Sequence, residues 1–195
     1  MFITGRVRRT IEELEKYRVT HKRGPDRMYI DTRSPFSLYP PEWGRYEECC
    51  NSVRWGGKDA HCWMKFEMIV PERFAGKTLL AEFSTEHTDD WNIANPQFKV
   101  FQNKELVQGL DVNHREMILC KEAVPGECLV YEVSVYSGMD DAVFPVSLSY
   151  GQFDALVDKV VYDLQVPMKV IAELHEGDER RIRIGAILEL SLIHI

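Results

Sequence analysis

The chain has 195 residues and a mass of 22.7 kDa, with 45% hydrophobic and 28% charged residues, which is the composition of a soluble globular protein with a real core. Its net charge of −7 disfavours nucleic acid and an anionic membrane surface as partners. No apolar run approaches the ~18 residues of a membrane span, and the charged start MFITGRVRRTIEELEKYR lacks the apolar centre of a secretory signal. We therefore expect a cytoplasmic protein.

The first 50 residues predict a helix followed by an extended arm. Thr10 is a candidate N-cap, because apolar side chains recur at helical spacing after it and Glu13 supplies the carboxylate of a capping box. The segment from His21 to Glu48 is rich in turn residues, and the prolines of SPFSLYPPEWGR disfavour a long helix or a central strand.

Residues 51–150 contain short alternating runs, separated by turn residues at intervals of about ten residues, the spacing of a β-sandwich. In CLVYEVSVY, for example, one face carries only large apolar side chains, Leu129, Tyr131, Val133 and Val135. The predicted fold class is therefore α+β and mainly β: an antiparallel β-sandwich of jelly-roll or galactose-binding-like type, with an N-terminal helix and arm and C-terminal helices.

The period changes from two to 3.6 residues after Gly151, so helices are expected over residues 151–189. The first helix should end near Pro167, because a proline lacks the amide hydrogen that continues a helix. A second helix should follow, carrying Met168 and Ile171 on its apolar face.

Five cysteines, an odd number with one adjacent pair, form a poor disulfide framework and favour reduced thiols; they are Cys49, Cys50, Cys62, Cys120 and Cys128. Zinc could in principle use the pairs 49–50 and 61–62, but zinc ligands are usually separated by two to four residues so that both face one ion. We expect no metal site in this chain.

The stretch PQFKVFQNKELVQGLDVNHREMIL predicts a hairpin with Asn103 at its tip, because asparagine tolerates positive φ. Asp111, Asn113 and His114 follow the second strand. These residue types build metal and acid/base sites, but aspartate and asparagine are also favoured in turns, where their side chains bond nearby backbone amides. We assign Asp111 and His114 to turn bonding and packing, and expect no catalytic residue.

Exposed aromatic rings are candidate sugar-stacking platforms, and Trp91 and Trp55 are the candidate carbohydrate-binding residues. Trp91 lies in the polar stretch TEHTDDWNIANP. The alternative for both is packing in the core or between domains, which is how most buried tryptophans are used.

The blocks WGGKDAHCWMKFEMIVPERFAGKTLLAEFST, PQFKVFQNKELVQGLDVNHREMIL and FDALVDKVVYDLQVP resemble the region that precedes the catalytic domain in α-mannosidases of glycoside hydrolase family 38, cytosolic and bacterial branch. The resemblance covers residues 43–188. The family often has Asn-Gly at the hairpin tip, whereas this chain has Lys104 in the glycine position, which suggests a turn wider than two residues.

This resemblance implies a retaining, zinc-dependent glycosidase whose aspartate nucleophile and metal ligands belong to a later domain. No segment of residues 1–195 matches that domain's His-Ile-Asp motif. The final residues LSLIHI match the translation of a transposon end used to prepare sequencing libraries. We therefore interpret residues 190–195 as adapter-derived, and the chain as ending before its catalytic domain.

Two functions remain open. The first is an accessory, non-catalytic sandwich that docks on the catalytic domain of an α-mannosidase, with an α-mannoside as substrate, zinc as the cofactor of the full-length enzyme and a homo-oligomer as a further candidate assembly. The second is an independent carbohydrate-binding module. Docking predicts apolar surface on the C-terminal helices, whereas a binding module predicts an aromatic-lined groove on the sandwich.

Overall fold

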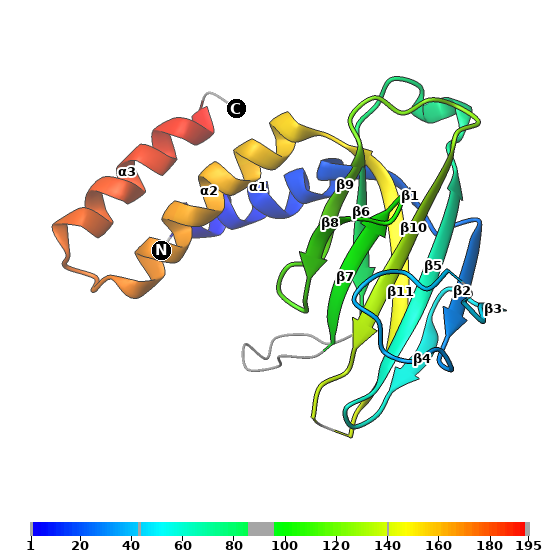
Figure 1. The fold of residues 1–195 in the computed structure, drawn as a ribbon. Coiled ribbons are helices and arrows are strands. Elements are labelled where there is room, and N and C mark those ends of the chain that lie inside the picture. Colours follow the sequence, from blue (N-terminus) through cyan, green and yellow to red (C-terminus); the bar gives the residue numbers. More distant parts are fainter. Residues whose placement is uncertain (1, 43, 86–95, 140, 194–195) are drawn as a thin grey trace. The chain divides into compact units, whose positions relative to one another are not determined.

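The computed structural model describes residues 2–42, 44–85, 96–139 and 141–193, and Figure 1 shows their arrangement. The chain forms two compact units: residues 21–152, and residues 1–20 together with 153–195. The domain boundaries predicted at 50/51 and 150/151 therefore differ from the boundaries of these two units. Residues 21–50 belong to the unit that contains the sandwich, and the first helix belongs to the unit that contains the C-terminal helices.

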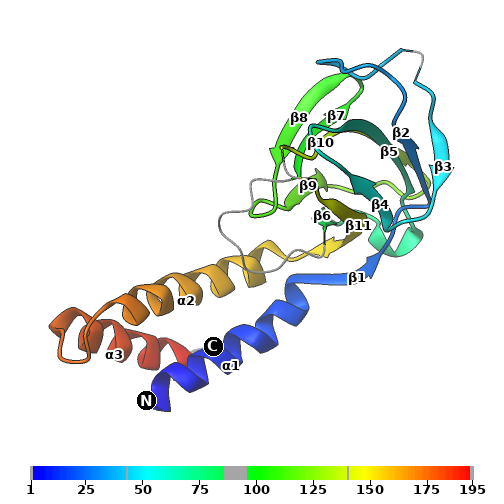
Figure 2. The same cartoon turned by 90° about the horizontal axis from the view of Figure 1, so that it is seen from below.

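The larger unit is built on two β-sheets that face one another (Figure 2). One sheet has the order β3 (Glu47–Cys49), β2 (Arg27–Asp31), β5 (His61–Ile69), β10 (Cys128–Tyr136), β7 (Gln97–Gln102) and β8 (Glu105–Leu110). The other has the order β1 (Val19–Arg23), β11 (Val143–Phe153), β6 (Leu79–Ser84) and β9 (Glu116–Cys120), with β4 (Val53–Gly56) also paired to β11. One 3-10 turn, η1 (Glu72–Phe74), follows β5. The pairs β5–β10, β7–β10 and β6–β11 are antiparallel, and the predicted sandwich with helices is confirmed.

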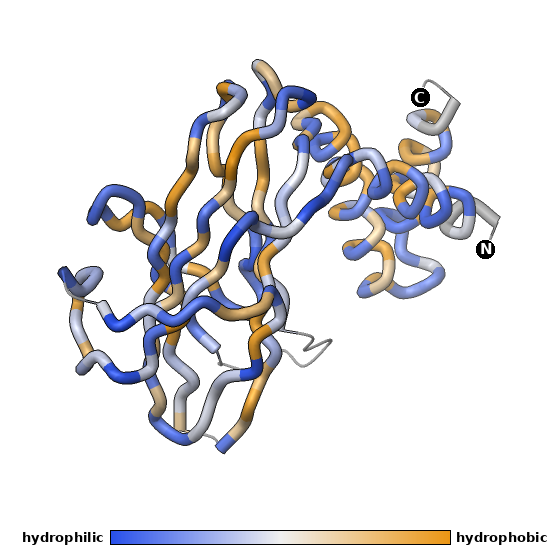
Figure 3. The backbone as a smooth tube through the Cα atoms, turned by 90° about the vertical axis from the view of Figure 1, so that its right-hand side faces the viewer, coloured by the Kyte–Doolittle hydropathy of each residue, from blue (hydrophilic) through white to orange (hydrophobic). Residues whose placement is uncertain are grey.

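The core lies between the two sheets and follows the two-residue period of the strands. In β10 the four apolar side chains predicted to share a face, at 129, 131, 133 and 135, are all buried. Apolar and polar residues alternate along the strands in Figure 3. Phe66 of β5 meets Phe83 of β6 edge to face across the core, with ring centroids 5.6 Å apart. Burying a side chain of this size contributes about 1.5–3 kcal/mol.

The predicted start of the first helix was wrong. Helix α1 spans Phe2–Arg18, so Thr10 lies in its interior, where its hydroxyl donates to the backbone oxygen of Arg6 (3.1 Å). This bond to the carbonyl four residues earlier satisfies the hydroxyl without breaking the helix.

The expectation of an arm without a central strand was also wrong for part of residues 21–48. Strand β2 lies between β3 and β5 in the six-stranded sheet. The strand has only five residues and lies among turn residues, so the sequence pattern did not reveal it. Met28 of this strand is buried in the core, and this tertiary packing stabilises the segment as a strand.

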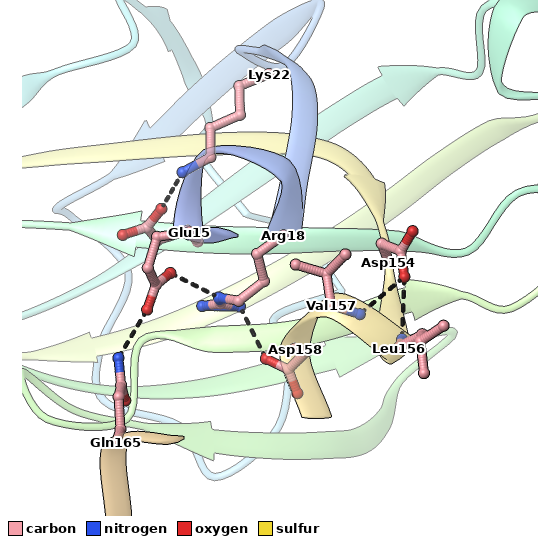
Figure 4. A network of polar contacts seen from close by, with 9 residues as sticks. Glu15, Arg18, Lys22, Asp154, Leu156, Val157, Asp158 and Gln165 are labelled. Carbon is pink, nitrogen blue, oxygen red and sulfur yellow. Dashed lines mark hydrogen bonds and ion pairs between the residues drawn. The ribbon is translucent and has the colours of Figure 1, made fainter. Parts of the chain in front are cut away.

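The smaller unit contains α1, α2 (Ala155–Glu173) and α3 (Glu179–Ile193). Asp154 caps α2, because its carboxylate accepts from the amides of Leu156 and Val157 at 3.0 Å each (Figure 4). The helix does not end near Pro167, as predicted, but continues six residues past it. The loss of one backbone bond at the proline is offset by burial of Leu164 and Ile171, on either side of it, against the other helices.

The three helices share a small apolar core made of Val7, Leu164, Ile171 and Leu188. Beside it, Arg18 links the helices by polar contacts: its guanidinium lies 3.3 Å from Glu15 and 3.4 Å from Asp158 (Figure 4). These contacts fix how α1 meets the start of α2. None of the described helices combines the length and the apolar character needed to cross a bilayer.

The β7–β8 hairpin closes through a two-residue turn. Gln102 pairs with Glu105, while Asn103 and Lys104 between them have φ of +52° and +67°. The expectation of a wider turn at Lys104 was therefore wrong. Positive φ at both central residues matches the right-handed twist of the strands, and this match outweighs the cost of about 1 kcal/mol for a lysine in that region.

Candidate functional site

A hollow of about 600 Å³ lies on the outer face of the six-stranded sheet, the face turned away from the core. Its lining comes from strands and loops far apart in the sequence. The lining residues that matter most here are Phe36, His61, Lys99, Gly109, Ser134 and Tyr136. The volume falls within the range of about 300–1,000 Å³ that is typical of small-molecule sites.

Strand register brings the polar members of this lining together. In β10 the residues between the buried ones face outward, and Ser134 lies opposite Lys99 of β7 while Tyr136 lies opposite His61 of β5. Lys99 in turn lies opposite Gly109 of β8. Since side chains alternate across a strand, these partners share the outer face.

A loop that includes residues 32–42 and 44–46, to which the name arm is restricted from here on, covers part of this face and is anchored near both ends by Asp31. The carboxylate of Asp31 accepts from the amides of Arg33 (2.9 Å), Ser34 (3.0 Å) and Arg45 (2.6 Å), and from the hydroxyl of Ser34 (2.6 Å). Asp31 is 1% exposed. Burial alone would raise its pKa, but these four hydrogen bonds outweigh burial and hold the pKa below its ordinary value.

The arm adds a partial third layer to the sandwich. Its Tyr39 packs against Phe101, with ring centroids 6.4 Å apart, and its Tyr46 hydroxyl donates to Glu132 of β10 at 3.0 Å. In Figure 1 the arm passes across the outer face of β7 and β10. The outer face also carries Trp63, which is fully buried. Trp63 and Phe101, which would otherwise face solvent, therefore pack together on the outer face of the sheet.

His61 stands at the edge of this cluster and lines the hollow. Its Nε2 lies 3.0 Å from the Ser134 hydroxyl, and Phe36 of the arm meets its ring edge to face at 5.1 Å. Burial, and then the positive charge of Lys99, lower the pKa of His61. Both causes favour the neutral imidazole, whose buried Nδ1 has no hydrogen-bond partner among the described residues.

Asp111 and His114 form one wall of the hollow as a rigid turn. Asp111 Oδ1 accepts from the amides of Asn113 (2.8 Å) and His114 (2.7 Å), and the His114 ring lies 3.1 Å from the same carboxylate oxygen. The assignment of these residues to turn bonding is confirmed, whereas the expected packing is not found, because the His114 side chain is 78% exposed. No cluster of three or more metal-ligating side chains occurs in the described part of the chain.

Of the two tryptophans predicted to bind carbohydrate, Trp55 is described by the structure and does not line the hollow. Trp91 lies outside the described residues. Trp55 is 8% exposed and packs in the sandwich core, so its sugar-binding role stays a prediction that this placement does not favour. Sequence reasoning missed Lys99 and Tyr136, although the outward half of the alternation in β7 and β10 could have indicated them.

A second hollow of about 500 Å³ lies between α2 and α3. Its lining is mostly apolar and includes Val166, Val170 and Ile187, which are 39%, 43% and 62% exposed. Exposed apolar side chains gathered in one groove indicate an interaction surface.

Searches of protein-family profiles and of curated proteins find no match to this chain. Among solved structures, the chain is similar to the β-glucuronidase of Faecalibacterium prausnitzii, with a TM-score of 0.43 and 12% identity. The match covers 68% of this chain and 31% of that one. The family is therefore not established, and a likeness of this size carries no conclusion about activity.

Proposed function

We propose that this chain is the N-terminal accessory region of an α-mannosidase of glycoside hydrolase family 38, which docks on the catalytic domain and has no catalytic residues itself. The observation that carries the proposal is the apolar groove between α2 and α3. A docking surface of this kind was the feature that distinguished an accessory region from an independent module. Of the three sequence blocks that resemble the family, the first two form strands of the sandwich and the third forms the start of α2.

The zinc expected in the full-length enzyme does not fit the described residues of this chain, which hold no set of three His, Cys, Asp or Glu side chains around a common point. Tetrahedral zinc sites in enzymes use three protein ligands. The chemistry would therefore lie in the catalytic domain, and the part played by this region would be to shape or support the substrate cleft.

The test is association with the separately expressed catalytic region of a family 38 α-mannosidase, measured by size-exclusion chromatography with light scattering. Val170→Asp and Ile187→Asp place a charge in the groove and should abolish association. Leu106→Asp is the matched control, since Leu106 is 59% exposed on β8, in the other unit. Equal association of all three variants would refute docking through the groove.

The chain alone should release no aryl α-mannoside, with or without added zinc. Retaining glycosidases need two carboxylates about 5–5.5 Å apart that flank the scissile bond. Three of the described acids, Asp111, Asp154 and Glu82, serve instead in a turn, a helix cap and a surface ion pair. Hydrolysis by the purified chain that is lost on mutating one of its own carboxylates would contradict the proposal.

An independent carbohydrate-binding module is the second candidate function. The hollow on the sandwich favours it, because the hollow combines aromatic rings with hydrogen-bonding side chains. A module of this kind would bind sugar without any catalytic domain.

A further inference from the structure

We propose that the hollow at the edge of the arm binds a single pyranose ring at the end of a glycan, with Tyr136 and Phe36 as stacking surfaces and Lys99 and Gln97 as hydrogen-bond donors. The inference gives the second candidate function its site. It concerns residues 21–152 only and does not rest on docking through the helices.

The two stacking rings are held in place before any ligand arrives. The Tyr136 hydroxyl donates to Asp59 at 2.9 Å, which fixes the direction of its ring. Phe36 is 66% exposed and belongs to the arm that Asp31 anchors. Rigid aromatic rings with exposed area bind the apolar faces of sugar rings at low entropic cost.

The polar groups of the hollow match hydroxyl groups better than they match an anion or an apolar ligand. Lys99 and Gln97 are exposed on the same face of β7, and no described residue bonds to either side chain. Among the described residues of the lining, Lys99 is the one lysine or arginine, and Asp111 stands in the same lining. A phosphate group would be better served by an arginine cluster or a helix N-terminus, neither of which lines the described hollow.

Gly109 forms part of the floor and leaves room for the ligand. A Cβ atom built there meets a single atom within 4 Å, the backbone oxygen of Phe98 at 3.9 Å. Gly109 is exposed, and its backbone is not in the left-handed region. A larger side chain can therefore fill the hollow from this position without straining the strand.

The experiment is ligand-observed NMR on the whole chain with methyl α-mannopyranoside, methyl α-glucopyranoside, methyl α-galactopyranoside and methyl β-glucuronide as probes. At least one of the three neutral glycosides should bind with a dissociation constant in the millimolar range. Gly109→Leu and Tyr136→Ala should each weaken that binding at least tenfold. Lys99→Ala should weaken it severalfold, whereas Lys121→Ala, an exposed lysine just after β9 in the other sheet and outside the lining, should leave it unchanged.

Thermal unfolding of each variant separates a lost site from a lost fold, and Gly109→Leu should unfold at the wild-type temperature. The proposal is overturned if none of the four probes binds the folded chain, or if binding persists in folded Gly109→Leu. Binding of the glucuronide alone, lost at high salt, would assign the site to an anionic sugar and overturn the neutral pyranose. If the chain binds sugar but does not associate with the catalytic region, only the docking proposal is refuted.

Discussion

Replacing Asp31 with asparagine should detach the arm from the sheet. The substitution keeps the side-chain volume and one acceptor oxygen, but it puts an NH₂ group where the second carboxylate oxygen accepts from the Ser34 hydroxyl and the Arg45 amide, both at 2.6 Å. Asp31 is 1% exposed, so water cannot replace these partners while the arm stays in place.

The magnitude follows from the number of bonds lost. Hydrogen bonds to a charged group contribute about 1.5–3 kcal/mol each. The bond from the Arg45 amide is lost, and the Ser34 hydroxyl can only exchange its bond to the carboxylate for a weaker one that it accepts from the new NH₂ group. The neutral amide is less costly to bury than a carboxylate, which returns part of that loss. We expect Asp31→Asn to lower the free energy of unfolding by about 2–4 kcal/mol.

Urea unfolding and limited trypsin digestion test this together. Trypsin should cut Asp31→Asn faster after Arg33 and Arg45, the arginines of the arm. Asp26→Asn is the matched control, because Asp26 is also an acceptor in this unit, at 2.7 Å from the amide of Ile69, but does not touch the arm. Unchanged stability and equal digestion of wild type and Asp31→Asn would refute the anchoring role.

The depressed pKa of Asp31 adds a pH dependence with a definite sign. Because the pKa in the folded state lies below the value of about 4 in the unfolded chain, the carboxylate contributes stability that is fully present above pH 4. This contribution is lost as the pH falls through the folded-state pKa. The arm of the wild type should therefore become sensitive to an acid-active protease below pH 4, whereas Asp31→Asn should be sensitive at every pH.

Three further changes have expected outcomes. Lys104→Gly should raise the free energy of unfolding by about 1 kcal/mol in urea, because glycine removes the strain at φ +67°, and a decrease would show that the lysine is not strained. Pro167→Ala should raise the apparent stability of the helical unit by about 1–3 kcal/mol, because alanine restores the missing bond to the carbonyl of Asp163; loss of helicity by circular dichroism would contradict this. Phe66→Ala should lower the unfolding free energy by about 3–5 kcal/mol, since Phe66 is fully buried, and a cost below 1 kcal/mol would place the core elsewhere.

The sandwich could be predicted from the sequence because its strands carry a strong two-residue period. In β10 and β11 every second residue is apolar over seven or more positions, and that pattern fixes both the strand and its buried face. Helix α2 was equally clear up to Pro167. The error there arose because local propensity penalises proline, whereas packing of Leu164 and Ile171 decides whether the helix continues.

The hollow could not be predicted from the sequence, because its residues come from four strands and two loops. His61 and Ser134 are 73 residues apart in the chain, and their contact depends on the register of β5 against β10. Register is set by the whole sheet and not by any single segment. The anchoring role of Asp31 could not be predicted for a similar reason. Its partner Arg45 is 14 residues further along the chain, after a turn-rich segment without a regular period.

The arm explains how the six-stranded sheet can carry buried aromatic side chains on its outer face as well as in the core. A sheet in an antiparallel sandwich normally turns one face to water, and the outer-face positions of β5 and β7 would then be polar. Trp63 and Phe101 occupy such positions and are nonetheless buried, Phe101 against Tyr39 of the arm. The polar lining at His61 and Lys99 begins where this cover ends. The hollow thus lies at the edge of the arm, and a ligand that contacts Phe36 would bind the arm and the sheet at once. Binding of the ligand and anchoring of the arm would then reinforce each other.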